Sequence, residues 1–209
     1  MFIAKWNKSV ILSYVGLVFA VVGMYICCTT GNILHALSCL IVSGVCDLFD
    51  GKVARMCKRT KDEIKFGIQL DSLVDTASFV VFPIIILLTL GLTNWYQIPV
   101  LALFAICGIA RLGHFNCLVE DSDKPVSYYT GLPVTAIAMV LPLLYLLSYI
   151  IPTSVYEIVL TILIAVNALL NILTIKVKKP TGIAYPIFAI AAIVMLVLFL
   201  GVLWWYTIE

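Results

Sequence analysis

The sequence predicts an all-α membrane protein that crosses the bilayer several times, and two observations support this. Of its 209 residues, 63% are hydrophobic and only 11% are charged, whereas soluble domains carry about 25% charged residues. Five runs contain no Asp, Glu, Lys or Arg: 9–46, 76–110, 125–156, 158–175 and 181–208. Because a membrane-spanning helix needs roughly 20 apolar residues, each of the longer runs holds more than one span, or a span and a turn.

Turn-like stretches divide these runs into predicted spans. The first run breaks at TTGN (29–32) and the second at GLTNWYQIP (91–99), both rich in turn-forming residues. The predicted spans are 10–28, 33–50, 67–90, 98–118, 131–151, 155–175 and 183–206. No internal repeat or low-complexity linker interrupts them, so we expect one transmembrane domain over residues 1–209.

The basic residues predict the orientation of the spans. All thirteen lie before the first span, in the second connection, beside the fourth or after the sixth: Lys5, Lys8, Lys52, Arg55, Lys58, Arg59, Lys61, Lys65, Arg111, Lys124, Lys176, Lys178 and Lys179. The remaining connections contain no Lys or Arg. Under the positive-inside rule, the N-terminus and the loop 51–66 are cytoplasmic. We therefore expect an integral protein of the cell membrane with these segments inside the cell.

Four aspartates flank this loop at helical spacing. Asp47 and Asp50 share one face of the second helix with Ala54 if that helix continues past the membrane edge. Asp71 and Asp75, four residues apart, share one face of the third helix with Gly67. Because a short loop joins the two helices, we expect them to be antiparallel neighbours whose aspartate faces meet near the cytoplasmic surface.

Four converging carboxylates repel one another unless cations lie among them. Oxygen-only ligands suit Mg²⁺ or Mn²⁺, and two-metal sites commonly support phosphoryl transfer. Small residues leave room for a ligand beside the helices, and Arg55 can complement a phosphate. The alternative is that these are ordinary water-facing charges at helix ends. That explanation suits Asp62 and Glu63, but not Asp71 and Asp75, which an uninterrupted apolar run follows.

The segments DLFDGKVAR (47–55) and GIQLDSLVD (67–75) resemble the signature of the CDP-alcohol phosphotransferase family, D-x2-D-G-x2-A-R followed by G-x3-D-x3-D. All eight fixed positions match: Asp47, Asp50, Gly51, Ala54, Arg55, Gly67, Asp71 and Asp75. The spacer 56–66 is longer than the commoner family length. Three further segments, FGIQLDSLVDTASFVVFP (66–83), RLGHFN (111–116) and YYTGLPVT (128–135), are similar to the phosphatidylserine synthase branch. His114 departs from the more usual residues of that branch.

This resemblance implies a six-helix core with two divalent cations, Mg²⁺ or Mn²⁺, between the second and third helices, often in a homodimer. The C-terminal span would be an addition to that core. The implied reaction is transfer of the phosphatidyl group from CDP-diacylglycerol to L-serine, which releases CMP. The implied partners are these substrates, membrane lipid and a second copy of the chain, without nucleic acid.

The resemblance also suggests residue roles. Asp47, Asp50, Asp71 and Asp75 are expected to be metal ligands, and Asp75 is expected to deprotonate the serine hydroxyl as well. The residues expected to contact the CDP-lipid are Asp47, Gly51, Ala54, Arg55, Gly67 and Asp71. Arg111 is the candidate partner of the serine carboxylate, with Asn116 and the turn 131–133 completing the site. The alternative for Arg111 is a side chain that extends along apolar surface to the membrane interface.

Two other functions remain open from the sequence. A sister phosphotransferase would use glycerol 3-phosphate or inositol phosphate as the acceptor, and only the resemblance of 111–116 and 128–135 favours serine. A divalent cation transporter would also carry acidic residues within the membrane. A transporter site would lie near the bilayer midplane on broken helices, whereas these aspartates cluster at one end beside a basic loop.

Overall fold

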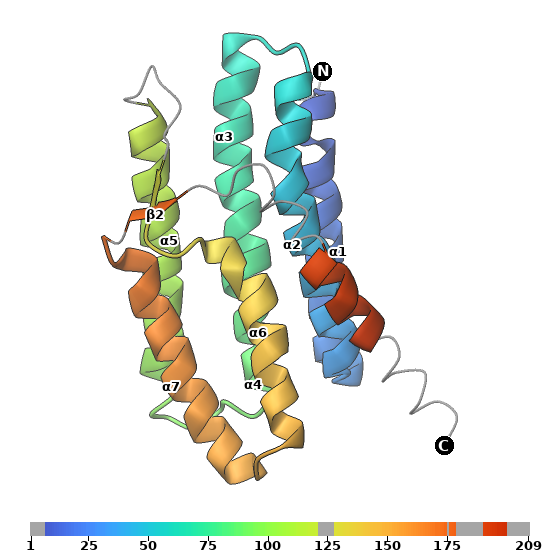
Figure 1. Ribbon diagram of the computed structural model, residues 1–209, viewed down its shortest axis with the longest axis vertical. Helices are drawn as coiled ribbons and strands as arrows, with labels where there is room; N and C mark the ends of the chain where they lie inside the picture. Colours follow the sequence, from blue (N-terminus) through green and yellow to red (C-terminus); the bar gives the residue numbers. More distant parts are fainter. Residues whose placement is uncertain (1–6, 121–127, 175, 179–189, 200–209) are drawn as a thin grey trace.

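Antiparallel helices dominate the computed structural model, which describes residues 7–120, 128–174, 176–178 and 190–199 (Figure 1). Five helices are long and apolar enough to cross a membrane: Lys8–Thr30, Ile33–Met56, Lys61–Thr89, Ile98–Leu118 and Thr153–Ile172. Shorter apolar helices, Val134–Tyr149 and Ile190–Phe199, lie within the predicted fifth and seventh spans. The all-α, polytopic prediction is confirmed. Residues 183–189 and 200–206 of the predicted seventh span lie outside the described residues.

The first two helices pack closely along their length. A short 3₁₀ helix, η1 (Lys8–Val10), leads into α1 (Ile11–Thr30), which ends at Gly31 with φ 64°. The next helix, α2 (Ile33–Met56), begins where the Asn32 side chain accepts a hydrogen bond from the His35 N–H at 3.2 Å. A Cβ at Gly16 would lie 3.2 Å from the Cβ of Cys46. Glycine at that position therefore lets the two backbones approach.

The predicted loop 51–66 is wrong in its bounds, because most of it is helical. The second helix continues to Met56, and α3 (Lys61–Thr76) already begins at Lys61. Thr60 and Glu63 form a capping box, in which each side chain accepts a hydrogen bond from the other residue's backbone N–H. This cap supplies partners to backbone donors that a helix start leaves open. The connection is therefore only residues 57–60.

A π-helical turn, η2 (Ala77–Val81), interrupts the long helix just after Asp75, and α4 (Phe82–Thr89) continues it. The Phe82 N–H donates to the carbonyl of Ala77, five residues back. Pro83 follows directly; it has no N–H to donate, and its ring crowds the carbonyl four residues earlier. Widening the preceding turn accommodates the proline, and such turns are frequent near functional sites.

The remaining helices complete a bundle around this long helix. On one side of it α5 (Ile98–Glu120) packs along α7 (Thr153–Ile172), and on the other side lie α1 and α2 (Figure 1). The short segment η3 (Val134–Ala136), α6 (Ile137–Leu146) and η4 (Leu147–Tyr149) packs on α2, where a Cβ at Gly44 would lie 2.6 Å from the Cβ of Ala138. Fully buried side chains from several helices form the core: Leu37, Ile41, Phe79, Phe82, Ile86, Phe104, Ile137 and Leu141.

A small pair of strands, which the sequence did not predict, joins the ends of α5 and α7. The strands β1 (Tyr128–Thr130) and β2 (Lys176–Lys178) pair antiparallel. Beyond β1 the chain turns at Gly131, with φ 78°, and the Leu132 N–H donates to the carbonyl of Leu170 at 2.9 Å. A Cβ at Gly131 would lie 2.5 Å from the backbone oxygen of Asn171. This turn needs glycine both for its φ and for its space.

Candidate functional site

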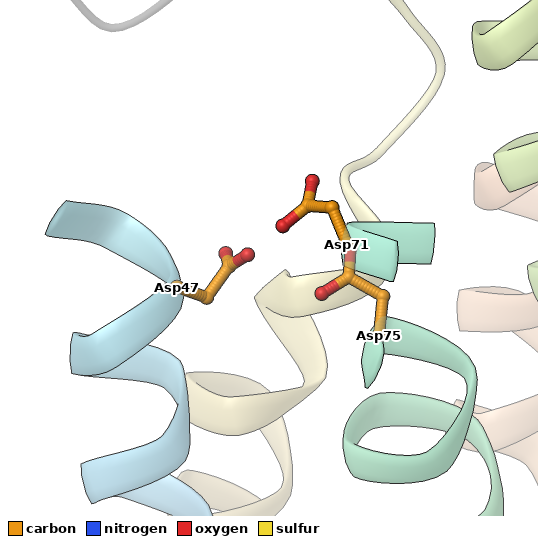
Figure 2. Close-up of side chains that lie close together, drawn as sticks. All are labelled: Asp47, Asp71 and Asp75. Carbon is orange, nitrogen blue, oxygen red and sulfur yellow. The ribbon is translucent and has the colours of Figure 1, made fainter. Parts of the chain in front are cut away.

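Three of the four signature aspartates meet between α2 and α3. Asp47 points from α2 toward Asp71 and Asp75 on α3 (Figure 2). One carboxylate oxygen from each residue lies within 4.8 Å of those of the other two. Asp75 is buried, and Asp47 and Asp71 are half-buried. The predicted spacing of four residues between Asp71 and Asp75 places both side chains on the face directed toward Asp47 of α2.

These three carboxylates fit a divalent cation. They offer only oxygen atoms, which Mg²⁺ and Mn²⁺ prefer. Three negative charges at this separation in a partly buried site repel one another strongly unless a cation or protons lie among them. Within the described part of the chain, no other group of three His, Cys, Asp or Glu side chains converges in this way. The donor set therefore suits a hard metal ion.

Asp50 adjoins this cluster but is held differently. It is buried, and its Oδ2 accepts a hydrogen bond from the Ser13 hydroxyl on α1 at 2.8 Å. Its carboxyl group also lies next to that of Asp71. Asp50 thus lies between the cluster of Asp47, Asp71 and Asp75 and the helix α1. Ser13 had no predicted role, because it is an isolated serine in an apolar run.

Two residues from outside the signature approach Asp47. The hydroxyl of Thr135, in η3, is in hydrogen-bonding contact with the Asp47 carboxyl group. Arg111, half-buried on α5, lies close enough for its positive charge to act on the same carboxyl group. Thr135 lies at the end of the YYTGLPVT segment, yet no local pattern assigned it to the site. The turn at Gly131 explains its position. The chain turns there beside α7, and the segment that follows, η3 and α6, packs on α2.

Two small signature residues, Gly51 and Gly67, have space beside them in the described part of the chain. No described residue outside the local helix lies within 4 Å of the position that a Cβ would take at Gly67. At Gly51 the nearest described atom, apart from the chain neighbours and the local helix backbone, is a guanidinium nitrogen of Arg55, 4.0 Å away. Arg55 itself is exposed in the last turn of α2, and Ala54 is half-buried. The structure thus leaves space beside Gly51 and Gly67.

Asn116 is placed by a contact with the signature helix. Its Oδ1 accepts a hydrogen bond from the hydroxyl of Ser72 at 3.0 Å. Ser72 directly follows Asp71, so this hydrogen bond, between residues 44 positions apart in the chain, places Asn116 next to the aspartate-bearing helix. His114, two residues before Asn116, is exposed.

Comparison with known proteins gives a family and several relatives. A family model described as CDP-alcohol phosphatidyltransferase matches residues 6–175. The CDP-diacylglycerol–serine O-phosphatidyltransferase of Saccharomyces cerevisiae is 38% identical over 112 residues, which cover 50% of this chain and 40% of that protein. The protein of the same name from Helicobacter pylori is 39% identical over 111 residues, covering 52% of this chain and 45% of the relative.

An archaeal relative carries a different name. The archaetidylserine synthase of Methanothermobacter thermautotrophicus is 33% identical over 120 residues, covering 57% of this chain and 49% of that protein. In all three comparisons the matched segment spans less than half the length of the relative.

Proposed function

Because this chain belongs to the CDP-alcohol phosphatidyltransferase family, we propose that it transfers the phosphatidyl group of CDP-diacylglycerol to the hydroxyl of L-serine. The products are phosphatidylserine and CMP. The observation that carries this proposal is the convergence of Asp47, Asp71 and Asp75 between two membrane helices. The names of the yeast and Helicobacter relatives support serine as the acceptor. Family membership favours an enzyme over a cation transporter.

Asp47, Asp50, Asp71 and Asp75 are the residues that would hold two divalent ions, Mg²⁺ or Mn²⁺. Such ions, when bound, neutralise charge on the diphosphate and on the departing CMP. The space beside Gly51 and Gly67 suits the nucleotide end of the CDP-lipid. Arg55, exposed at the end of α2, can approach a phosphate.

In the reaction the serine hydroxyl oxygen forms a bond to the phosphorus that carries the diacylglycerol. The bond from that phosphorus to the bridging oxygen breaks, and the electron pair leaves with CMP. Asp75 accepts the hydroxyl proton. Its burial beside Asp47 and Asp71 places a basic oxygen within the cluster rather than in water.

Arg111 is the proposed partner of the serine carboxylate. Its charge acts on Asp47, and this proximity to the aspartates supports the proposal. A guanidinium carries several N–H donors in a planar fork, so it can contact Asp47 and a substrate carboxylate together. Asn116, held by Ser72 next to Asp71, would complete the serine site.

The test is an assay of the purified full chain in detergent with CDP-diacylglycerol and Mn²⁺ or Mg²⁺. Serine, glycerol 3-phosphate and inositol phosphate are supplied in turn, and CMP release and the lipid product are measured. We expect turnover with serine. Faster turnover with another acceptor would assign the chain to a sister activity, and no CMP release with any acceptor would contradict the proposal. The cytoplasmic site, the homodimer and the single domain over 1–209 are part of the same proposal.

A further inference from the structure

Ser13 makes an unusual hydrogen bond for a helical serine. Serine and threonine hydroxyls within helices often bond the carbonyl four residues earlier, as Thr29, Thr30 and Ser38 do here. The Ser13 hydroxyl instead donates to Oδ2 of Asp50, 37 residues away on α2, at 2.8 Å. Both side chains are buried. A hydrogen bond to a charged, buried acceptor is among the stronger ones in proteins.

The packing of α1 on α2 makes this contact possible. Gly16, one turn after Ser13, lies against Cys46, one turn before Asp50. Without a side chain at Gly16 the helices approach closely, and Ser13 then reaches the carboxyl group. Since α1 lies outside the signature, the contact links the aspartates to a helix that contributes no carboxylate of its own.

We propose that Ser13 is a positioning residue that occupies one oxygen of Asp50, so that Asp50 offers only its other oxygen to a divalent ion. A carboxylate that binds through one oxygen suits the strict octahedral geometry of a small ion, whereas Ca²⁺ readily takes both oxygens. Ser13 thereby favours Mn²⁺ or Mg²⁺ over Ca²⁺. This inference rests on the proposed function only for the presence of a divalent ion at the aspartates.

The experiment measures metal binding without any lipid substrate. Mn²⁺ is titrated into the metal-free full chain in detergent, free Mn²⁺ is followed by electron paramagnetic resonance, and Ca²⁺ competition gives the Ca²⁺ affinity. We expect Ser13→Ala to raise the Mn²⁺ Kd by about tenfold or more, as losses of outer-shell partners commonly do. The Ca²⁺ Kd should rise much less, because the released Asp50 oxygen becomes available to that ion.

Ser78→Ala is the matched control. Ser78 is also buried in a helix near the aspartates, but its hydroxyl has no hydrogen-bond partner in the described part of the chain. Its removal should leave both metal affinities unchanged. Ser13→Cys keeps the side-chain volume with only a weak S–H donor, and it is expected to shift the affinities in the same direction should Ser13→Ala fail to fold.

The outcomes separate this inference from the proposed function. If the wild-type chain binds no Mn²⁺, the proposed metal site itself fails. If the wild type binds Mn²⁺ and the Ser13 variants match it, the positioning role is wrong while the metal site stands. An equal loss of Mn²⁺ and Ca²⁺ affinity would also overturn the inference, because a merely structural role weakens both ions alike.

Discussion

Replacing Gly131 with alanine should loosen the turn that directs η3 toward the aspartates. The added Cβ would lie 2.5 Å from the backbone oxygen of Asn171 and 3.1 Å from that of Leu170. Alanine at φ 78° costs about 1–2 kcal/mol. Displacing the turn also loses the hydrogen bond from the Leu132 N–H to Leu170, worth about 0.5–1.5 kcal/mol. Together we expect about 1.5–3.5 kcal/mol of lost stability.

The functional consequence follows from Thr135, which the turn places against Asp47. Because a shifted turn withdraws this hydroxyl, Gly131→Ala should raise the Mn²⁺ concentration needed for half-maximal CMP release. Thermal unfolding in detergent and a Mn²⁺ titration of activity measure the two effects. Gly113→Ala is the control, since a Cβ there meets no described atom within 4 Å and alanine suits a helix interior.

The expected result is a lower unfolding temperature and a higher Mn²⁺ requirement for Gly131→Ala, with neither change for Gly113→Ala. If Gly131→Ala unfolds at the wild-type temperature and needs no more Mn²⁺, the turn does not position the site as argued.

Three further results are expected. EDTA should abolish CMP release, and Mn²⁺ or Mg²⁺ should restore it. Asp71→Asn should lower the rate of CMP release by orders of magnitude. Full turnover of metal-free protein would contradict the metal proposal. Arg111→Ala should raise the serine KM by about one to two orders of magnitude, and Arg111→Lys should recover part of the loss. An unchanged serine KM in folded Arg111→Ala protein would mean that another residue binds the serine carboxylate. A Lys61→Cys variant in intact cells should show no more labelling by an impermeant thiol reagent than the wild type; stronger labelling would reverse the proposed orientation.

Several features could be predicted from the sequence because they depend on local pattern. Charge-free runs predict membrane helices, since the bilayer excludes charge whatever the tertiary packing. The spacing of Asp71 and Asp75 follows from the helical period. The start of α3 was also present in the sequence, because Thr60 and Glu63 have the capping-box spacing. The predicted third span begins too late, because its start was placed after the last charged residue of the loop and not at the capping box.

The sequence by itself determined the membrane class, the helical character and the pairing of aspartates on single helix faces, all of which follow from hydropathy and the helical period. Only the tertiary structure decided that Asp47, Asp71 and Asp75 converge while Asp50 turns to Ser13. It also decided that Thr135 reaches Asp47 from a distant turn. These contacts join residues far apart in the chain, and they depend on how closely helix backbones pack, which no periodicity along one segment records.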